Sequence, residues 1–144
     1  MPHPDHAPSI EALEERLALT VDPSTLYAGY FDNGIWRFDV NQDTRLDPTG
    51  REAPFRFGMA GDVGVVGNWN GDVSGQTEVG VFRRGLWSLD LNGSQAYEAN
   101  GDTSFYYGRW DDVPVVGRWN QSSNNDSVGV FRRHAPGNYD VAVW

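Results

Sequence analysis

A motif that recurs about every fifty residues is the feature that most constrains what this chain can fold into. Residues 29–41 read GYFDNGIWRFDVN, residues 80–92 read GVFRRGLWSLDLN, and residues 129–144 begin with GVFRRH. The second and third copies follow similar segments, DVGVVGNWNGD at 62–72 and DVPVVGRWNQS at 112–122. Such a period is typical of repeat proteins, in which each unit buries its apolar face against a neighbouring unit.

The residues within each copy predict strands. In the second copy, Trp87, Leu89 and Leu91 alternate with Ser88 and Asp90. This period of two is typical of a strand with one buried face. The seventeen glycines and eight prolines suit a chain of short strands joined by turns. The sequence therefore predicts an all-β fold.

The second copy contains the full predicted unit. We expect strands over Val63–Trp69, Glu78–Arg84, Leu86–Leu91 and about Ser104–Gly108, with a tight hairpin turn at Arg84-Gly85. Four antiparallel strands in about fifty residues form one β-propeller blade. By this pattern the chain contains about two and a half blades.

The chain divides into a tail and a repeat domain. Residues 1–25 form a polar, proline-rich tail and a short helix, and residues 26–144 form the repeats. The repeats are a partial blade of three strands at 26–60, a full blade at 61–110 and a partial blade at 111–144.

The predicted N-terminal helix spans about residues 9–20. Ser9 is a suitable N-cap, and Ile10, Leu13 and Leu17 fall on one helical face. This helix takes the place of the leading strand of the later copies. The first repeat is therefore expected to lack that strand or to receive it from elsewhere.

The composition excludes several classes of partner. The net charge of −9 disfavours nucleic acid and anionic membranes, which need clustered positive charge. All eleven cationic side chains are arginine, and cysteine is absent, which excludes disulfides and thiolate chemistry. No apolar run reaches the length of a membrane span, and no signal-peptide pattern opens the chain. The pattern indicates a cytoplasmic protein, or an extracellular one if this is a processed chain.

These motifs resemble a known family. VPVVGRWN at 113–120, a polar loop, VGVFR at 128–132 and WSLDLN at 87–92 are similar to the bacterial FG-GAP/VCBS-like repeat, related to integrin-type propeller blades. The resemblance covers about residues 26–144. It implies a β-propeller whose blades usually carry a calcium loop of the form Asp-x-Asn-x-Asp-Gly-x-x-Asp.

The corresponding loops of this chain differ from the calcium-binding sequence that is usual in the family. The second copy offers Asn68, Asn70, Asp72 and, after an insertion, Glu78. Calcium needs six to eight oxygen ligands, several of them anionic. Two interpretations stay open: a weak calcium site formed by these four residues, or an ordinary turn closed by Asx hydrogen bonds. No other cofactor is expected.

The third copy is a poorer calcium loop. Arg118 stands where the first ligand should be, and Asp126 is the one acidic residue of the loop. Arg118 could replace the metal internally by pairing with Asp126 or Asp112.

Two sets of repeated polar residues have structural interpretations. In each of the pairs Arg83-Arg84 and Arg132-Arg133, we expect one arginine to pair with a carboxylate and one to be solvated. Asp39 and Asp90 each follow a tryptophan by three residues, and we expect them to accept hydrogen bonds in loops.

The aromatic residues fall into two groups. Trp36, Trp87, Trp69 and Trp119 recur at equivalent positions, so core or inter-blade packing is expected of them. A second group lies outside the repeat pattern and predicts a binding surface. Its residues are Tyr106, Tyr107, Arg109, Trp110 and Asp111.

Three functions are compatible with the sequence. The first is a non-enzymatic module that self-assembles and binds protein, because partial propellers leave apolar faces and strand edges. A homodimer is favoured, then a trimer. The second is a lectin-like oligomeric propeller that binds glycans. The third is a small glycoside hydrolase. A serine-protease triad would depend on His134, and no nucleophile elbow accompanies it.

Overall fold

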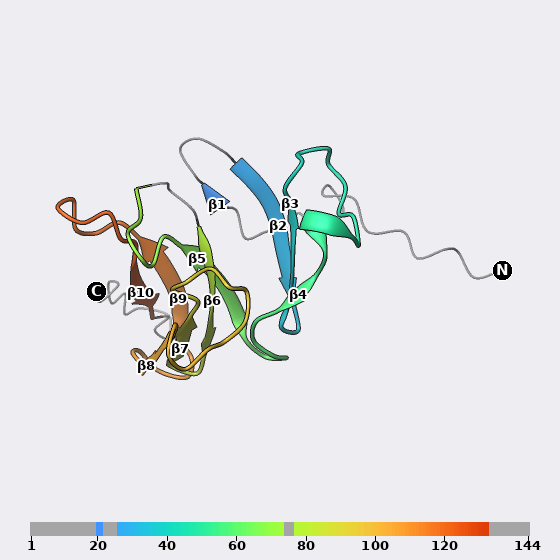
Figure 1. The fold of residues 1–144 in the computed structure, drawn as a ribbon. Helices are drawn as coiled ribbons and strands as arrows, with labels where there is room; N and C mark the ends of the chain where they lie inside the picture. The colour runs from blue at the N-terminus through green and yellow to red at the C-terminus, as the bar shows by residue number, and fades with distance from the viewer. Residues whose placement is uncertain (1–19, 22–25, 74–76, 133–144) are drawn as a thin grey trace.

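The described chain folds into three antiparallel sheets, which confirms the predicted all-β class. This computed structural model describes residues 20–21, 26–73 and 77–132. The sheets have strand orders β1-β2-β3-β4, β5-β6-β7-β8 and β10-β9, so the first two are meanders of four consecutive strands and the third is an antiparallel pair (Figure 1). The strands are β1 Thr20–Val21, β2 Leu26–Asp32, β3 Ile35–Asp39, β4 Phe55–Arg56, β5 Val63–Gly67, β6 Glu78–Arg83, β7 Leu86–Leu89, β8 Thr103–Tyr106, β9 Val113–Gly117 and β10 Ser127–Phe131.

The second sheet confirms the predicted four-strand unit. Each of its strands begins and ends within a few residues of the predicted bounds. Strands β6 and β7 are joined by a two-residue turn, in which Arg84 has φ 51° and Gly85 has φ 88°. Asn33 and Gly34 form the same turn in the first sheet, with φ 50° and 87°. A turn with two consecutive residues at positive φ has the twist that matches the right-handed twist of antiparallel strands. Glycine adopts positive φ without strain, and it is the second residue of both turns.

The first sheet differs from the prediction at its leading edge. Strand β1 pairs antiparallel with β2, with Val21 opposite Leu26. The expectation that the first repeat lacks its own leading strand is therefore wrong: a two-residue strand occupies that place. The helix predicted over residues 9–20 lies outside the described residues, except that its last residue, Thr20, is in β1. A 3-10 helix, η2 (Gly50–Glu52), lies in the loop between β3 and β4.

The third sheet contains two described strands. Val128 lies opposite Val116, and Phe131 lies opposite Val113. The third strand predicted for this repeat would fall in 133–144, which is outside the described residues, as is His134.

The first and second sheets share one buried cluster. Trp36 of β3 and Phe57, which directly follows β4, pack with Val79 and Val81 of β6. Gly64 in β5 permits the close approach, because a Cβ there would lie 2.8 Å from the Phe31 ring. The Trp36 indole Nε1–H donates to the Phe57 carbonyl at 2.9 Å, so its burial leaves no donor unsatisfied.

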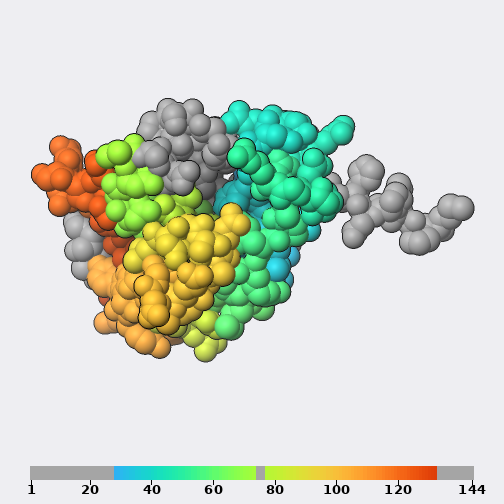
Figure 2. Space-filling model, viewed as in Figure 1, coloured from blue at the N-terminus to red at the C-terminus, as the bar shows by residue number. Residues whose placement is uncertain are grey.

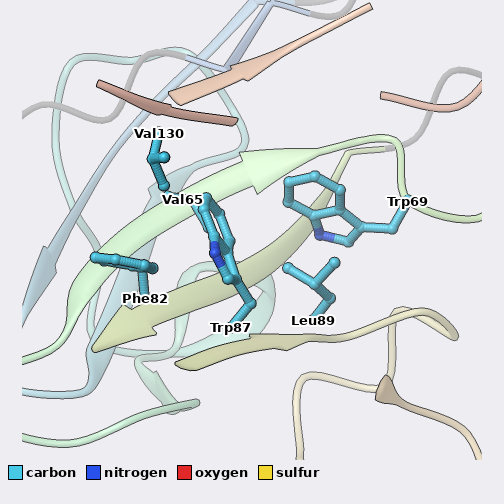
Figure 3. Close-up of a cluster of buried hydrophobic side chains, with 6 residues drawn as sticks. All are labelled: Val65, Trp69, Phe82, Trp87, Leu89 and Val130. Atoms are coloured by element: carbon cyan, nitrogen blue, oxygen red, sulfur yellow. The ribbon is translucent and has the colours of Figure 1, made fainter. Parts of the chain in front are cut away.

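The second and third sheets share another cluster (Figure 3). It joins residues from the opposite face of the second sheet to Val130 of β10. Trp87 is fully buried at its centre and donates Nε1–H to the Tyr107 carbonyl at 2.9 Å. The cluster is composed of Val65, Trp69, Phe82, Trp87, Leu89 and Val130.

The tryptophans of the repeat thus follow the predicted core role with one exception. Trp36, Trp69 and Trp87 are buried, whereas Trp119 is about half exposed, at 45%. The second sheet has a neighbour on both faces, and the first and third sheets lie on its two sides (Figure 1).

Candidate functional site

The loop after β5 brings the four predicted metal ligands together in a hydrogen-bonded turn. Asn68 Oδ1 accepts the Gly71 N–H at 2.7 Å, and Asn70 Oδ1 accepts the Asp72 N–H at 2.8 Å. Both are Asx-type bonds, in which a side-chain oxygen replaces a backbone acceptor. The arrangement is that of the turn interpretation. Among residues 20–21, 26–73 and 77–132, no group of three or more acidic or histidine side chains is placed to hold a metal.

Glu78 closes this turn from the start of β6. Its Oε2 accepts the Trp69 N–H and its Oε1 accepts the Asn70 Nδ2–H, both at 2.9 Å. Burial raises the pKa of Glu78, and the nearby charges of Asp72 and Asp90 add to the increase, while the Trp69 N–H lowers it. The buried Glu78 side chain therefore links the turn to strand β6 by hydrogen bonds.

The same loop is joined to the loop of the next repeat. Asp126 Oδ2 accepts the Asn68 N–H at 2.9 Å, and the Asp126 N–H donates to the Asn68 carbonyl at 2.8 Å. The Asn125 Nδ2–H donates to the Trp69 carbonyl at 2.7 Å. We call these four residues, Asn68, Trp69, Asn125 and Asp126, the inter-repeat latch.

Arg118 lies beside the latch. Its Nε is 3.9 Å from Asp126 Oδ1, and both side chains are partly exposed. Of the two partners considered from the sequence, Arg118 is near Asp126, but an exposed pair at this distance contributes little.

Asp112 is instead paired with an arginine of the repeated pairs. Arg132 donates from Nε and Nη2 to the two oxygens of Asp112, both at 2.8 Å. These bonds are the main reason why the pKa of Asp112 lies below its usual value. In the preceding repeat, Arg83 Nε lies 2.9 Å from Asp62 Oδ1, an ion pair without hydrogen-bond alignment.

The expectation for the arginine pairs is confirmed for the three arginines that the structure describes. Arg83 is paired and Arg84 is exposed in the hairpin turn. Arg132 is paired, and Arg133 is outside the described residues. The partners of these arginines, Asp62 and Asp112, were not predicted from the sequence. Both stand directly before the first strand of a repeat, and this recurrence was the available signal.

The expectation for Asp39 and Asp90 is also confirmed. Asp39 accepts the Asp43 and Thr44 N–H groups at 3.2 and 3.0 Å. Asp90 accepts the Ser94 and Gln95 N–H groups at 3.1 and 2.8 Å. Burial raises the pKa of Asp90, and these bonds oppose the increase.

Two further carboxylates that accept backbone N–H groups in loops were not predicted from the sequence. Glu52, in η2, is buried and accepts the Val40 and Asn41 N–H groups at 3.1 and 2.9 Å. Asp102 accepts the Leu91 N–H at 3.0 Å in the second repeat. Val40 and Leu91 are equivalent positions in the two repeats, and their acids follow them by 12 and 11 residues, so this recurrence was an available signal.

The predicted binding residues gather at the end of β8 and in the turn that follows. Trp110 is 75% exposed and Tyr106 is 80% exposed, and Arg109 and Asp111 are also exposed. Tyr107 is separate from them, because it is half-buried and packs against the core cluster. We call Tyr106, Arg109, Trp110 and Asp111 the aromatic patch.

A tight turn holds the aromatic patch. The Arg109 N–H donates to Asp112 Oδ2 at 2.7 Å, and the Asp112 N–H donates to the Arg109 carbonyl at 3.3 Å. Because Asp112 is also held by Arg132, Trp110 projects from a fixed support.

The same turn exists without a tryptophan one repeat earlier. There the Met59 N–H donates to Asp62 Oδ2 at 2.9 Å, and Ala60 occupies the position of Trp110. The turn therefore does not require an aromatic residue at this position.

Comparison of the chain with protein-family models, curated proteins and solved structures found no match. Within the described residues, no helix has the length and apolar character needed to cross a bilayer.

Proposed function

We propose that this chain is a non-enzymatic, β-propeller-type repeat module, similar to FG-GAP/VCBS-like repeats, that self-assembles and binds a protein partner. Meanders of four strands that stack face to face support the propeller interpretation. The described residues form three sheets, which is fewer than the four to eight blades of a closed propeller, so we infer that a ring needs more than one copy.

The observation that carries the binding proposal is the exposure of Trp110. Ala60 stands at this position in the equivalent turn, so the turn itself does not account for a tryptophan there. Burying a large exposed aromatic ring against a partner is favourable, and Trp, Tyr and Arg are the residue types that dominate binding energy at protein interfaces. The aromatic patch contains one of each.

Glycan binding is the second candidate. Exposed Trp110 and Tyr106 rings offer faces on which a sugar ring can stack, and Arg109 and Asp111 offer polar groups for hydroxyls. The same residues serve both functions, so the experiment must separate the two ligands.

The test compares the wild-type chain with Trp110→Ala, and with Met59→Ala as the control in the equivalent turn. Each immobilised chain is exposed to extract of its source cells and, separately, to a glycan array. A protein retained by wild type and Met59→Ala but lost by Trp110→Ala supports the proposal. Glycan binding lost by Trp110→Ala supports the lectin alternative instead. Equal retention by all three chains would contradict both.

A further inference from the structure

The three sheets stack in the same orientation, so that the same two kinds of face meet at each junction. In the second sheet, one face carries Val66, Val79 and Val81, and we call the equivalent surface of each sheet its valine face. The opposite face carries Trp69 and Phe82, and we call the equivalent surface its tryptophan face. Within the chain, a tryptophan face packs against the valine face of the following sheet, first between sheets one and two and then between sheets two and three.

The tryptophan face of the third sheet is exposed. Its Trp119 and Phe131 occupy the positions of Trp69 and Phe82 in the second sheet. Trp69 and Phe82 are 5% and 2% exposed, whereas Trp119 and Phe131 are each 45% exposed. Residues that are core in one repeat are thus surface in the next.

This exposed face is already arranged for packing. In the second sheet, a Cβ on Gly67 would lie 2.6 Å from the Trp69 ring, which shows that the indole lies across that glycine. A Cβ on Gly117 would likewise lie 2.6 Å from the Trp119 ring. The two described strands of the third sheet therefore place Trp119 and Phe131 as β5 and β6 place Trp69 and Phe82, but without the same burial.

The valine face of the first sheet stands at the other end of the stack. Ala28 and Tyr30 occupy the positions of Val79 and Val81, and both are half-buried rather than buried. Arg37 lies opposite Tyr30 on β3, and its Nε is buried with no hydrogen-bond partner among the described residues. The described parts of the first and third repeats lie on opposite sides of the molecule in Figure 2.

We propose that the tryptophan face of the third sheet of one copy packs against the valine face of the first sheet of a second copy. This rests on the self-assembly in the proposed function and specifies its interface as head to tail. A head-to-tail contact closes into a ring when the rotation per copy permits it. Two copies, each with the three sheets formed by its described residues, supply six sheets, which is within the range of closed propellers.

The chemistry of the two faces is complementary. Trp119 and Phe131 present aromatic rings, and the valine face of the first sheet contains Tyr30 and Arg37, both half-buried. A guanidinium can stack on an indole, and aromatic pairs gain stability beyond their buried area. An aliphatic valine face lacks the cation, so this junction differs from the two internal ones.

Complementation between two variants tests the direction of the contact. Phe131→Asp damages the tryptophan face of the third sheet, and Tyr30→Asp damages the valine face of the first sheet. In a head-to-tail contact each variant alone is a monomer, but the mixture forms a one-to-one dimer through its one intact junction. Sedimentation velocity should show a dissociation constant at least about tenfold weaker for each variant alone.

Three outcomes would overturn the proposal. Assembly of Tyr30→Asp alone at wild-type affinity would mean that two tryptophan faces meet each other. Failure of the two folded variants to pair in the mixture would exclude the head-to-tail junction. A wild-type chain that is monomeric at all concentrations would exclude assembly, whereas loss of partner capture by Trp110→Ala would still support the binding role.

A milder pair of variants covers the case in which a charged substitution prevents folding. The chain has no cysteine, so Phe131→Cys and Tyr30→Cys each introduce a single thiol. In the chain, the equivalent residues Phe82 and Val130 share one cluster. A short bis-maleimide should cross-link the mixture of the two variants to a dimer and leave each variant alone uncross-linked. Absence of that hetero-specific product would overturn the proposal.

Discussion

The second and third sheets have nearly the same strand sequences but different surroundings. VGVVG and EVGVFR form β5 and β6, and VPVVG and SVGVF form β9 and β10. The second sheet is covered on both faces, whereas the third keeps Trp119 and Phe131 half exposed. A repeat sequence thus specifies which residues can be core, and the neighbouring sheet decides whether they are.

The largest effect should come from truncating the two equivalent tryptophans. We expect Trp69→Ala to lower the free energy of unfolding by about 3–5 kcal/mol, because it removes a buried ring and its hydrogen bond to the Val79 carbonyl. Trp119→Ala should cost about 1 kcal/mol or less in the monomer. Urea unfolding at low protein concentration measures both. Equal losses would show that the two sheets are equally well buried, contrary to the comparison.

The two arginine–aspartate pairs allow a second comparison. Asp112→Asn should cost about 2 kcal/mol at neutral pH, because it removes the charge from two hydrogen bonds to Arg132. Asp62→Asn should cost less, because Arg83 is more exposed and makes a less aligned contact.

The effect of Asp112 should depend on pH. Its folded pKa is below the ordinary 3.8, so its stabilisation is complete above that value. As the pH falls through the folded pKa, the wild type should lose this stabilisation and approach Asp112→Asn. Melting temperatures between pH 2 and 7 provide the measurement. A difference that grows toward low pH would contradict the assigned direction.

The latch should be sensitive to a single methyl group. Gly71→Ala should cost about 1–2 kcal/mol, because Gly71 has φ 72° and a Cβ there would clash with Asn125 Oδ1. Gly93→Ala is the matched control: its φ is 69°, but the nearest atom to a Cβ is 3.9 Å away. The difference between the two variants measures the latch alone. Equal destabilisation would show that backbone strain accounts for the whole effect.

Calcium should have the smallest effect. The oxygens of Asn68, Asn70 and Glu78 already accept hydrogen bonds, and the turn contains few carboxylates to offset dehydration of the ion. Melting temperatures with chelator and with millimolar calcium should therefore agree within about one degree. A clear increase with calcium, lost in Asp72→Asn, would support the metal-site interpretation.

Local patterns predicted most of the strands because they depend on few residues. The alternation around Trp87 and the two hairpin turns, Asn33-Gly34 and Arg84-Gly85, determine where strands lie and reverse. The same logic assigned Asp39 and Asp90 to loops, because the backbone N–H groups that donate to them are four and five residues away. Leading strand β1 was missed because two residues are too few to show a period.

The candidate site was less predictable, because its parts depend on distant contacts. Tyr106 and Tyr107 are neighbours in sequence, but strand alternation places Tyr107 against the core and leaves Tyr106 exposed. The latch joins Asn68 to Asp126 across 58 positions, a pairing that exists only once two repeats have packed.

The sequence by itself therefore determined the all-β class, the repeat period, the hairpins and the residues able to form a core. Only the tertiary structure decided which of those residues are buried, which carboxylate each arginine meets and which aromatic rings face solvent. The physical reason is that hydrogen bonds within a turn or hairpin follow from adjacent residues, whereas burial requires a second surface. Trp69 and Trp119 differ in just this respect: one is covered by the next sheet of its own chain, and the other is half exposed.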